Sequence, residues 1–438
     1  MNFNDREGRE ALAEAYALFA RSALIPESPA MVRLFNMLEQ LYTGALADAC
    51  RSYHDAMSLM LSSPARRVSG SLLVDQLLYL AIQHEHPFAL SAAAGIRDEA
   101  IFKAMEEELQ VLGGLSQLKS EHFISMVQER RRIRARDDIS AKSAAVWSGA
   151  PLPQSRTQPQ FQEEPVQMPL AFAPLEYGDF GLTDSFVSDE ALEEIYLRLL
   201  ETRDWASLTE DLWNFFSAYG TGDFLRCRAF SIKNNLLSPL PEKVIAPLIP
   251  LSLYEAQHTR LMENTIRFMR GESCSSLLLT GEAGVGKTAH VVALLHELPE
   301  VRLVLACRGD LDALNGLLPR LAVQPLKFIL LLDDIDPDGD ELRLFASRTL
   351  GFAALPENVI LYGTSRNGNA GPYANTLSFL YPDLARFADM ISELLENDGA
   401  YVDRRSIHNA AVDHQVDVRE KLTFRGARSV TDKLKERE

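Results

Sequence analysis

Residues 277–288 read LLLTGEAGVGKT, and this stretch decides the fold of the chain. A short apolar run ends in the pattern G-x-x-x-x-G-K-T, and a helical pattern follows from residue 289 to residue 298. A strand, a glycine-rich loop and a helix in this order are typical of a Walker A phosphate loop, whose backbone N–H groups converge on phosphate oxygens. The glycines let the backbone bend, and the helix adds the positive end of its dipole. The sequence therefore predicts a nucleotide site.

The residues of this loop have distinct expected roles. Lys287 is expected to reach the β- and γ-phosphates of ATP, and the Thr288 hydroxyl to bind Mg²⁺. The predicted nucleotide contacts are Gly281, Glu282, Ala283, Gly284, Val285, Gly286, Lys287, Thr288 and Ala289. Leu253 and Tyr254, which precede the loop, are candidate adenine contacts. Ordinary core packing of both residues is the alternative.

A second motif supplies paired carboxylates. Residues 327–334 read KFILLLDD, which predicts a buried strand ending in a Walker B element. Asp333 is expected to hold Mg²⁺ through water, and Asp334 to act as the general base that polarises the attacking water. The alternative is a solvated turn, because further aspartates follow at Asp336, Asp338 and Asp340. An EF-hand calcium loop starting at Asp334 is excluded, because Phe345 occupies the position that requires a bidentate Glu.

A third strand pattern, residues 359–364, is followed by the sequence SRN. Thr364, Ser365 or Asn367 at this strand end is expected to orient water beside the γ-phosphate, with a simple strand cap as the alternative. Residues 301–306 predict a further strand, and residues 311–318 a short helix that ends near Pro319. Strands alternating with helices indicate a parallel sheet buried on both faces.

The chain divides by composition into five predicted regions. Residues 1–137 are expected to form an all-helical interaction domain, and residues 138–174 are a linker rich in Pro, Gln and Ser. Residues 175–250 are predicted as a helical connector, 251–370 as the P-loop core and 371–438 as a helical lid. The basic run QERRRIRAR at 128–136 suits a solvated helix end, and a contact with nucleic acid or an acidic partner is the alternative.

The composition excludes several other classes of protein. The 438 residues carry a formal net charge of −17, which disfavours binding to nucleic acid or an anionic membrane. No apolar run is long enough to span a membrane, and residues 1–6 (MNFNDR) lack a signal-peptide core. The 4 cysteines are far apart without metal-ligand spacing, which favours free thiols and a cytoplasmic location.

These motifs together resemble an AAA+ ATPase, and residues 219–434 resemble the bacterial AAA+ family named domain of unknown function 815. The resemblance rests on the following segments: YGTG at 219–222, NTIRF at 264–268, residues 328–334, PENV at 356–359, YGTS at 362–365 and GARS at 426–429. It implies an α/β P-loop NTPase fold, with an AAA+-like parallel sheet, helices on both faces and a small C-terminal helical lid, preceded by an all-α region. It also implies that Arg428 senses the γ-phosphate, and that the chain assembles into a homo-oligomer.

The chain departs from this family at one point. Family members carry an S-D-R-F-G-L segment after the third strand, a source of the arginine finger, and residues 367–379 lack it. Arg366 and Arg386 are near but out of register. We therefore expect a Mg²⁺-dependent ATPase, whose hydrolysis is slow, that couples ATP to a protein partner bound by the N-terminal helices. The alternatives are a nucleotide-gated scaffold with little hydrolysis and a DNA-associated helicase-loader-like ATPase.

Overall fold

The computed structural model describes residues 8–43, 45–133, 175–176, 190–241, 244–245, 252–336, 339–340, 355–366, 373–418 and 422–436. The chain forms two compact units, Met1–Ser217 and Ala218–Glu438. The predicted linker 138–174 lies outside the described residues, and the five domain bounds stay predictions. No helix among the described ranges has the length and apolarity that crossing a membrane would require.

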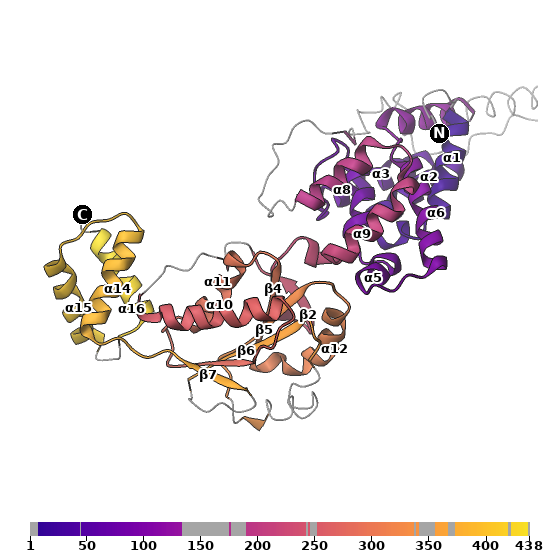
Figure 1. Ribbon diagram of the computed structural model, residues 1–438. Coiled ribbons are helices and arrows are strands. Elements are labelled where there is room, and N and C mark those ends of the chain that lie inside the picture. The colour runs from indigo at the N-terminus through magenta and orange to yellow at the C-terminus, as the bar shows by residue number, and fades with distance from the viewer. Residues whose placement is uncertain are drawn as a thin grey trace, which may run out of the picture. The chain divides into compact units, whose positions relative to one another are not determined.

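Helices make up nearly all of the described part of the first unit, which confirms the prediction of an all-helical N-terminal region (Figure 1). The helices include α1 (Gly8–Arg21), α2 (Pro29–Thr43), α3 (Leu46–Ser62), α4 (Leu72–Leu78), η3 (Tyr79–Gln83), α5 (Pro87–Ala93), α6 (Glu99–Leu115), α8 (Glu190–Glu201) and α9 (Thr209–Tyr219). Short polar side chains start several of them, as helix caps do. Asp98, for example, accepts hydrogen bonds from the backbone N–H groups of Ala100 and Ile101 at the start of α6.

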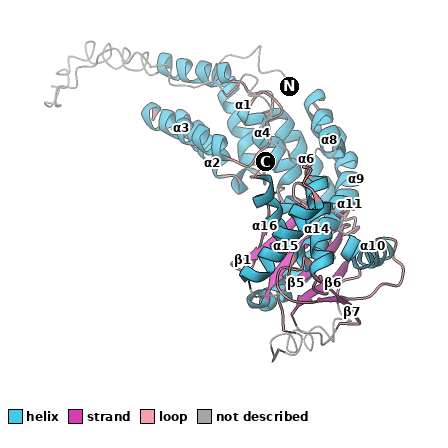
Figure 2. Ribbon diagram, turned by 90° about the vertical axis from the view of Figure 1, so that its left-hand side faces the viewer, coloured by secondary structure: helices cyan, strands magenta, loops and turns pink. Residues whose placement is uncertain are grey.

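A seven-stranded sheet forms the centre of the second unit (Figure 2). Its strands are β1 (Ala229–Lys233), β2 (Leu236–Pro239), β3 (Leu277–Thr280), β4 (Val301–Cys307), β5 (Lys327–Asp333), β6 (Val359–Ser365) and β7 (Asn375–Ser378). They lie in the order β2-β1-β4-β5-β6-β3-β7, and every pair is parallel except β1 and β2. The P-loop strand β3 therefore lies next to β6, which separates it from the aspartate-bearing strand β5.

The central strands are buried on both faces, as the continuous apolar runs predict. Successive residues of β5 point to opposite faces, so Ile329 and Leu331 pack in one core cluster, while Phe328 and Leu330 pack in the other. The first cluster includes side chains of α10 (Glu255–Met269), α11 (Lys287–Glu297) and the C-terminal helices, and the second includes those of α12 (Leu311–Ala322). The observed AAA+-type P-loop fold confirms the predicted class.

Three helices follow the sheet: α14 (Leu384–Asn397), α15 (Arg404–Val418) and α16 (Phe424–Lys435). They gather beside the sheet (Figure 1) and form the predicted lid.

Two features of the second unit differ from expectation. The helix that was predicted to end near Pro319 continues to Ala322, with the proline inside it. Leu317, Leu318 and Leu321 are buried around the proline, and this packing offsets the hydrogen bond that proline cannot donate. Strands β1, β2 and β7 lie outside the expected core range 251–370 and extend the sheet at both edges.

Candidate functional site

The loop between β3 and α11 has a backbone that only glycine adopts easily. Gly286 precedes α11 with φ +98°, in the left-handed region. Gly281 has φ +145°, and a Cβ at this position would lie 2.3 Å from the carbonyl oxygen of Phe379. The P-loop therefore bends closely against the residue that follows β7, and the loop glycines are needed for this approach.

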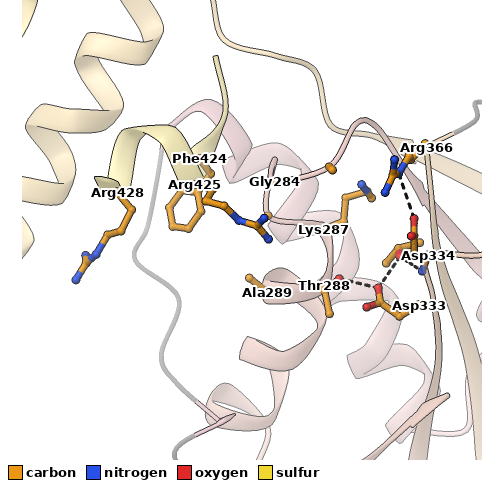
Figure 3. Close-up of a pocket in the computed structure, with 13 residues that line it drawn as sticks. Gly284, Lys287, Thr288, Ala289, Asp333, Asp334, Arg366, Phe424, Arg425 and Arg428 are labelled. Atoms are coloured by element: carbon orange, nitrogen blue, oxygen red, sulfur yellow. Dashed lines mark hydrogen bonds and ion pairs between the residues drawn. The ribbon is translucent and has the colours of Figure 1, made fainter. Parts of the chain in front are cut away.

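A pocket of about 560 Å³ opens over the loop (Figure 3). Its walls come from the P-loop, the ends of β5 and β6 and the start of α16. The lining residues are Ala283, Gly284, Gly286, Lys287, Thr288, Ala289, Asp333, Asp334, Thr364, Arg366, Phe424, Arg425 and Arg428. Side chains from segments far apart in the sequence thus meet where the Walker motifs predicted a nucleotide site.

Lys287 is the buried cation of this pocket. Its Nζ donates hydrogen bonds to the backbone oxygens of Gly281 (2.7 Å) and Glu282 (2.8 Å). Burial lowers the pKa of the ammonium group, whereas the carboxylates of Asp334 and Asp333 act in the opposite direction. The lysine is therefore held against the loop's own carbonyls, next to the space where phosphate would lie.

Asp333 joins the loop to the sheet. Its Oδ1 accepts hydrogen bonds from the hydroxyl groups of Thr288 (2.7 Å) and Thr364 (2.6 Å). Thr364 in turn accepts a hydrogen bond from the backbone N–H of Asp334 (2.8 Å). The two hydroxyls and the carboxylate come from α11, β6 and β5, so the ends of these three elements are fixed relative to one another.

This oxygen cluster fits a magnesium ion. The Thr288 hydroxyl and the Asp333 carboxylate are hard oxygen donors next to the phosphate loop, and Mg²⁺ takes its remaining ligands from phosphates and water. Among the described residues, no group of three or more His, Cys, Asp or Glu side chains forms a metal site. Thr288 and Asp333 could hold Mg²⁺ beside a nucleotide, whose phosphates would supply further oxygen ligands.

Asp334 lies one residue further along, where the chain leaves β5. Its backbone has φ +49°, a left-handed conformation that aspartate tolerates better than most residues. Its Oδ1 lies 3.4 Å from Nε of Arg366, the residue that follows β6 (Figure 3). The predicted general base is therefore ion-paired within the chain.

The lid contacts the P-loop through the start of α16. Thr423 caps this helix, and the backbone N–H of Arg425 donates a hydrogen bond to the Gly284 oxygen (3.1 Å). Figure 3 shows the Arg425 side chain extending toward the loop, while Arg428 points away from Lys287.

Arg428 is engaged elsewhere in the lid. Its guanidinium lies 3.4 Å from Asp398 and 3.8 Å from Asp432. The residue lines the pocket, but these ion pairs hold its charge on the lid side. Arg425 is the lid arginine whose side chain extends toward the phosphate loop.

Not all of the predicted contacts line the pocket. Tyr254 is 1% exposed, its hydroxyl donates to the Leu380 oxygen (3.0 Å), and its ring packs on His290 and Phe379. Leu253 packs against the same core, and neither residue lines the pocket. Gly281, Glu282, Val285 and Ser365 likewise support the loop or the sheet without lining the pocket. Asn367 lies outside the described residues.

Sequence reasoning missed Phe424 and Arg425 and gave Arg366 no role. The sequence contained a weak signal, because Thr423 is a typical helix cap and the residues after it form the first turn of α16. Which side of that turn faces the P-loop depends on how the helix docks, and sequence spacing does not give this.

Comparisons with known proteins agree with the fold. Residues 225–369 match the model of the family described as "Protein of unknown function (DUF815)". No curated protein matches the chain. Solved structures with similarity include the RuvB Holliday junction branch migration motor of Thermotoga maritima, with 19% identity and a TM-score of 0.33, covering 43% of this chain and 65% of that chain. The ORC1 protein of Aeropyrum pernix in complex with DNA has 20% identity and a TM-score of 0.35, covering 44% and 64%.

The chain thus spans less than two thirds of the length of these two structures, and similarity at this level carries no argument about function. The strand order and the P-loop carry the fold assignment. The resemblance stated from the sequence is confirmed: residues 225–369 of this chain match family DUF815, within a unit that has the AAA+-type P-loop fold.

Proposed function

We propose that this chain is a cytoplasmic, Mg²⁺-dependent AAA+-type ATPase that couples ATP binding and hydrolysis to an interaction with another protein. The observation that carries the proposal is the convergence of Lys287, Thr288, Asp333 and Thr364 in one pocket above the P-loop. A buried lysine, two hydroxyls and a carboxylate in this arrangement supply a cation for phosphate and oxygen ligands for magnesium.

Each residue of the pocket has a separate proposed role in phosphoryl transfer. The loop N–H groups and Lys287 bind the phosphates. In doing so, Lys287 exchanges its hydrogen bonds to the Gly281 and Glu282 oxygens for hydrogen bonds to phosphate oxygens. Thr288 and Asp333 would hold Mg²⁺, and the ion would neutralise negative charge on the phosphates. Thr364 keeps Asp333 and Asp334 at the end of the sheet, and Asp334 orients water for in-line attack on the γ-phosphate.

The lid supplies the remaining charge. Arg425 extends toward the P-loop from α16, and Arg428 lies one helical turn further along. The first unit, whose described elements are helices apart from an isolated bridge, is the proposed surface for a protein partner. A second copy of the chain is the proposed source of further catalytic charge, because the arginine-bearing segment of the family is absent from residues 367–379.

Steady-state ATP hydrolysis across a series of protein concentrations tests this proposal. Lys287→Ala removes the phosphate cation, and Lys433→Ala is a matched control on the exposed surface of α16. We expect turnover per subunit to rise with concentration, to persist in the control and to be lost in Lys287→Ala. Absence of nucleotide binding by the folded wild-type protein would refute the proposal.

A nucleotide-gated scaffold is the second candidate, and the Arg366–Asp334 ion pair favours it. A general base that is paired with arginine is less available to water, so binding without appreciable turnover would follow. Tight binding of ATP by the wild-type protein, with turnover no higher than in Lys287→Ala, would select this candidate over the ATPase.

A further inference from the structure

Arg366 occupies a position in the pocket that the Walker motifs do not explain. It follows Ser365, the last residue of β6, and its side chain lines the same pocket as Lys287. The Arg366 side chain is 59% exposed, and its Nε lies 3.4 Å from Asp334 Oδ1 (Figure 3). The arginine therefore reaches across from the neighbouring strand to the expected general base.

The backbones of the two partners are held in register. The backbone N–H of Asp334 donates to the Thr364 hydroxyl, and that of Ile335 donates to the Thr364 carbonyl oxygen (2.9 Å). Both residues thus leave adjacent strands whose ends are joined by hydrogen bonds to Thr364. The side chains can change partners while the strand ends keep their positions.

The ion pair itself is weak. Both side chains are mostly exposed, at 59% and 67%, and exposed ion pairs gain little because solvent screens them. A guanidinium binds phosphate more strongly, since its planar fork makes two parallel hydrogen bonds to phosphate oxygens. A terminal phosphate within reach would therefore compete successfully for Arg366.

Such a phosphate would lie close to the arginine. Arg366 lines the same pocket as Lys287 and Thr288. A phosphate drawn to Lys287 would therefore lie in the field of both cations. A diphosphate lacks this terminal phosphate, so it would offer Arg366 no replacement for its present partner.

We propose that Arg366 exchanges the Asp334 carboxylate for the terminal phosphate when a nucleoside triphosphate binds, and that this exchange frees Asp334 to orient water. The chain thereby distinguishes a triphosphate from a diphosphate with its own arginine. The inference rests on the proposed nucleotide site and adds to it a residue that reads the terminal phosphate.

Binding measurements separate this role from a structural one. The probes are Mg–ADP and Mg–AMPPNP, a triphosphate analogue that is not hydrolysed, titrated calorimetrically into the full-length protein. Arg366→Gln is expected to weaken AMPPNP about 10-fold or more, the loss typical of a charged hydrogen bond, and to leave ADP affinity within about twofold. Arg366→Lys keeps the charge without the fork and should fall between the two.

Two further variants complete the test. Asp334→Asn removes the competing carboxylate, so the ratio of AMPPNP to ADP affinity is expected to stay at the wild-type value or rise by up to about fivefold. Arg260→Gln changes an exposed arginine on α10, outside the pocket, and should leave both affinities unchanged. Thermal unfolding of each variant confirms that it is folded.

The outcomes distinguish the two proposals. If the wild-type protein binds both nucleotides and Arg366→Gln weakens both equally, or neither, this inference is overturned and the nucleotide site stands. If the folded wild-type protein binds neither nucleotide, the proposed function fails and the inference fails with it.

Discussion

Replacing Thr364 by valine removes one hydroxyl and keeps the shape of the side chain. Thr364 is 1% exposed, and its Oγ1 both donates to Asp333 Oδ1 at 2.6 Å and accepts from the Asp334 N–H at 2.8 Å. Valine makes neither bond. The backbone N–H of Asp334 then lacks its acceptor, and Asp333 loses one of its two hydroxyl donors.

The expected cost follows from these two losses. Leaving a part-buried N–H unpaired costs up to about 1–3 kcal/mol, and losing a hydrogen bond to a charged group costs a similar amount, less where water replaces either partner. Asp333 is partly exposed, so water offsets part of its loss. The extra buried methyl group of valine returns about 0.8 kcal/mol. We therefore expect a net loss of about 2 kcal/mol, which lowers the Tm of a unit of this size by about 4–8 °C.

Thr364→Ser is the matched control. Serine keeps the hydroxyl and loses only a methyl group, which costs about 1 kcal/mol. Urea unfolding should therefore rank the wild type above serine and serine above valine, whereas an order set by apolar burial alone would place valine first. Hydrogen exchange of residues 331–336 should accelerate in the valine variant. A valine variant as stable as the wild type, or more stable than the serine variant, would refute the reasoning.

Two other predictions concern stability. Gly363→Ala should lower the free energy of unfolding by about 1–3 kcal/mol, because the new Cβ would lie 2.3 Å from the Tyr373 hydroxyl; an unchanged Tm would contradict this. Burial lowers the pKa of His86 to about 4, against about 6.5 when unfolded, so unfolded chains take up a proton first and stability should fall as pH drops from about 6.5 toward 4. His86→Asn, which can still cap α5, should reduce that slope by up to about 1.4 kcal/mol per pH unit in urea titrations, and an identical slope would exclude His86 as the cause.

The central strands could be predicted because their continuous apolar runs suit few structures other than a buried strand. Residues 327–333 are apolar from Phe328 to Leu332, and a run of this length followed by charge suits a strand covered on both faces. The P-loop was equally clear, since its glycines have positive φ values that few other residues adopt. Helix α12 was cut short at Pro319 because the burial of the leucines around the proline cannot be read from the sequence.

The parts that sequence could not give depend on docking between distant segments. Strand β7 has the exposure pattern of an edge, with one buried residue, Leu377, in four, so its pairing with β3 determines that it is a strand at all. Tyr254 has an aromatic ring that could stack on a base, but its hydroxyl donates a hydrogen bond to the Leu380 oxygen and its ring lies in the core. In the lid, Asp398 binds Lys435 as well as Arg428, and these contacts, formed after α14, α15 and α16 pack, set where Arg428 points.

The cations of the pocket meet protein groups that a nucleotide would have to replace. Lys287 donates to two loop carbonyls, and Arg366 pairs with Asp334. The free energy of nucleotide binding is therefore the gain from the phosphate contacts minus the loss of the contacts within the chain that they replace. Any phosphate that reaches the loop replaces the lysine contacts, whereas only a terminal phosphate replaces the arginine contact. The second exchange alone exposes the general base, so the ion pair occupies Asp334 only while no triphosphate is bound.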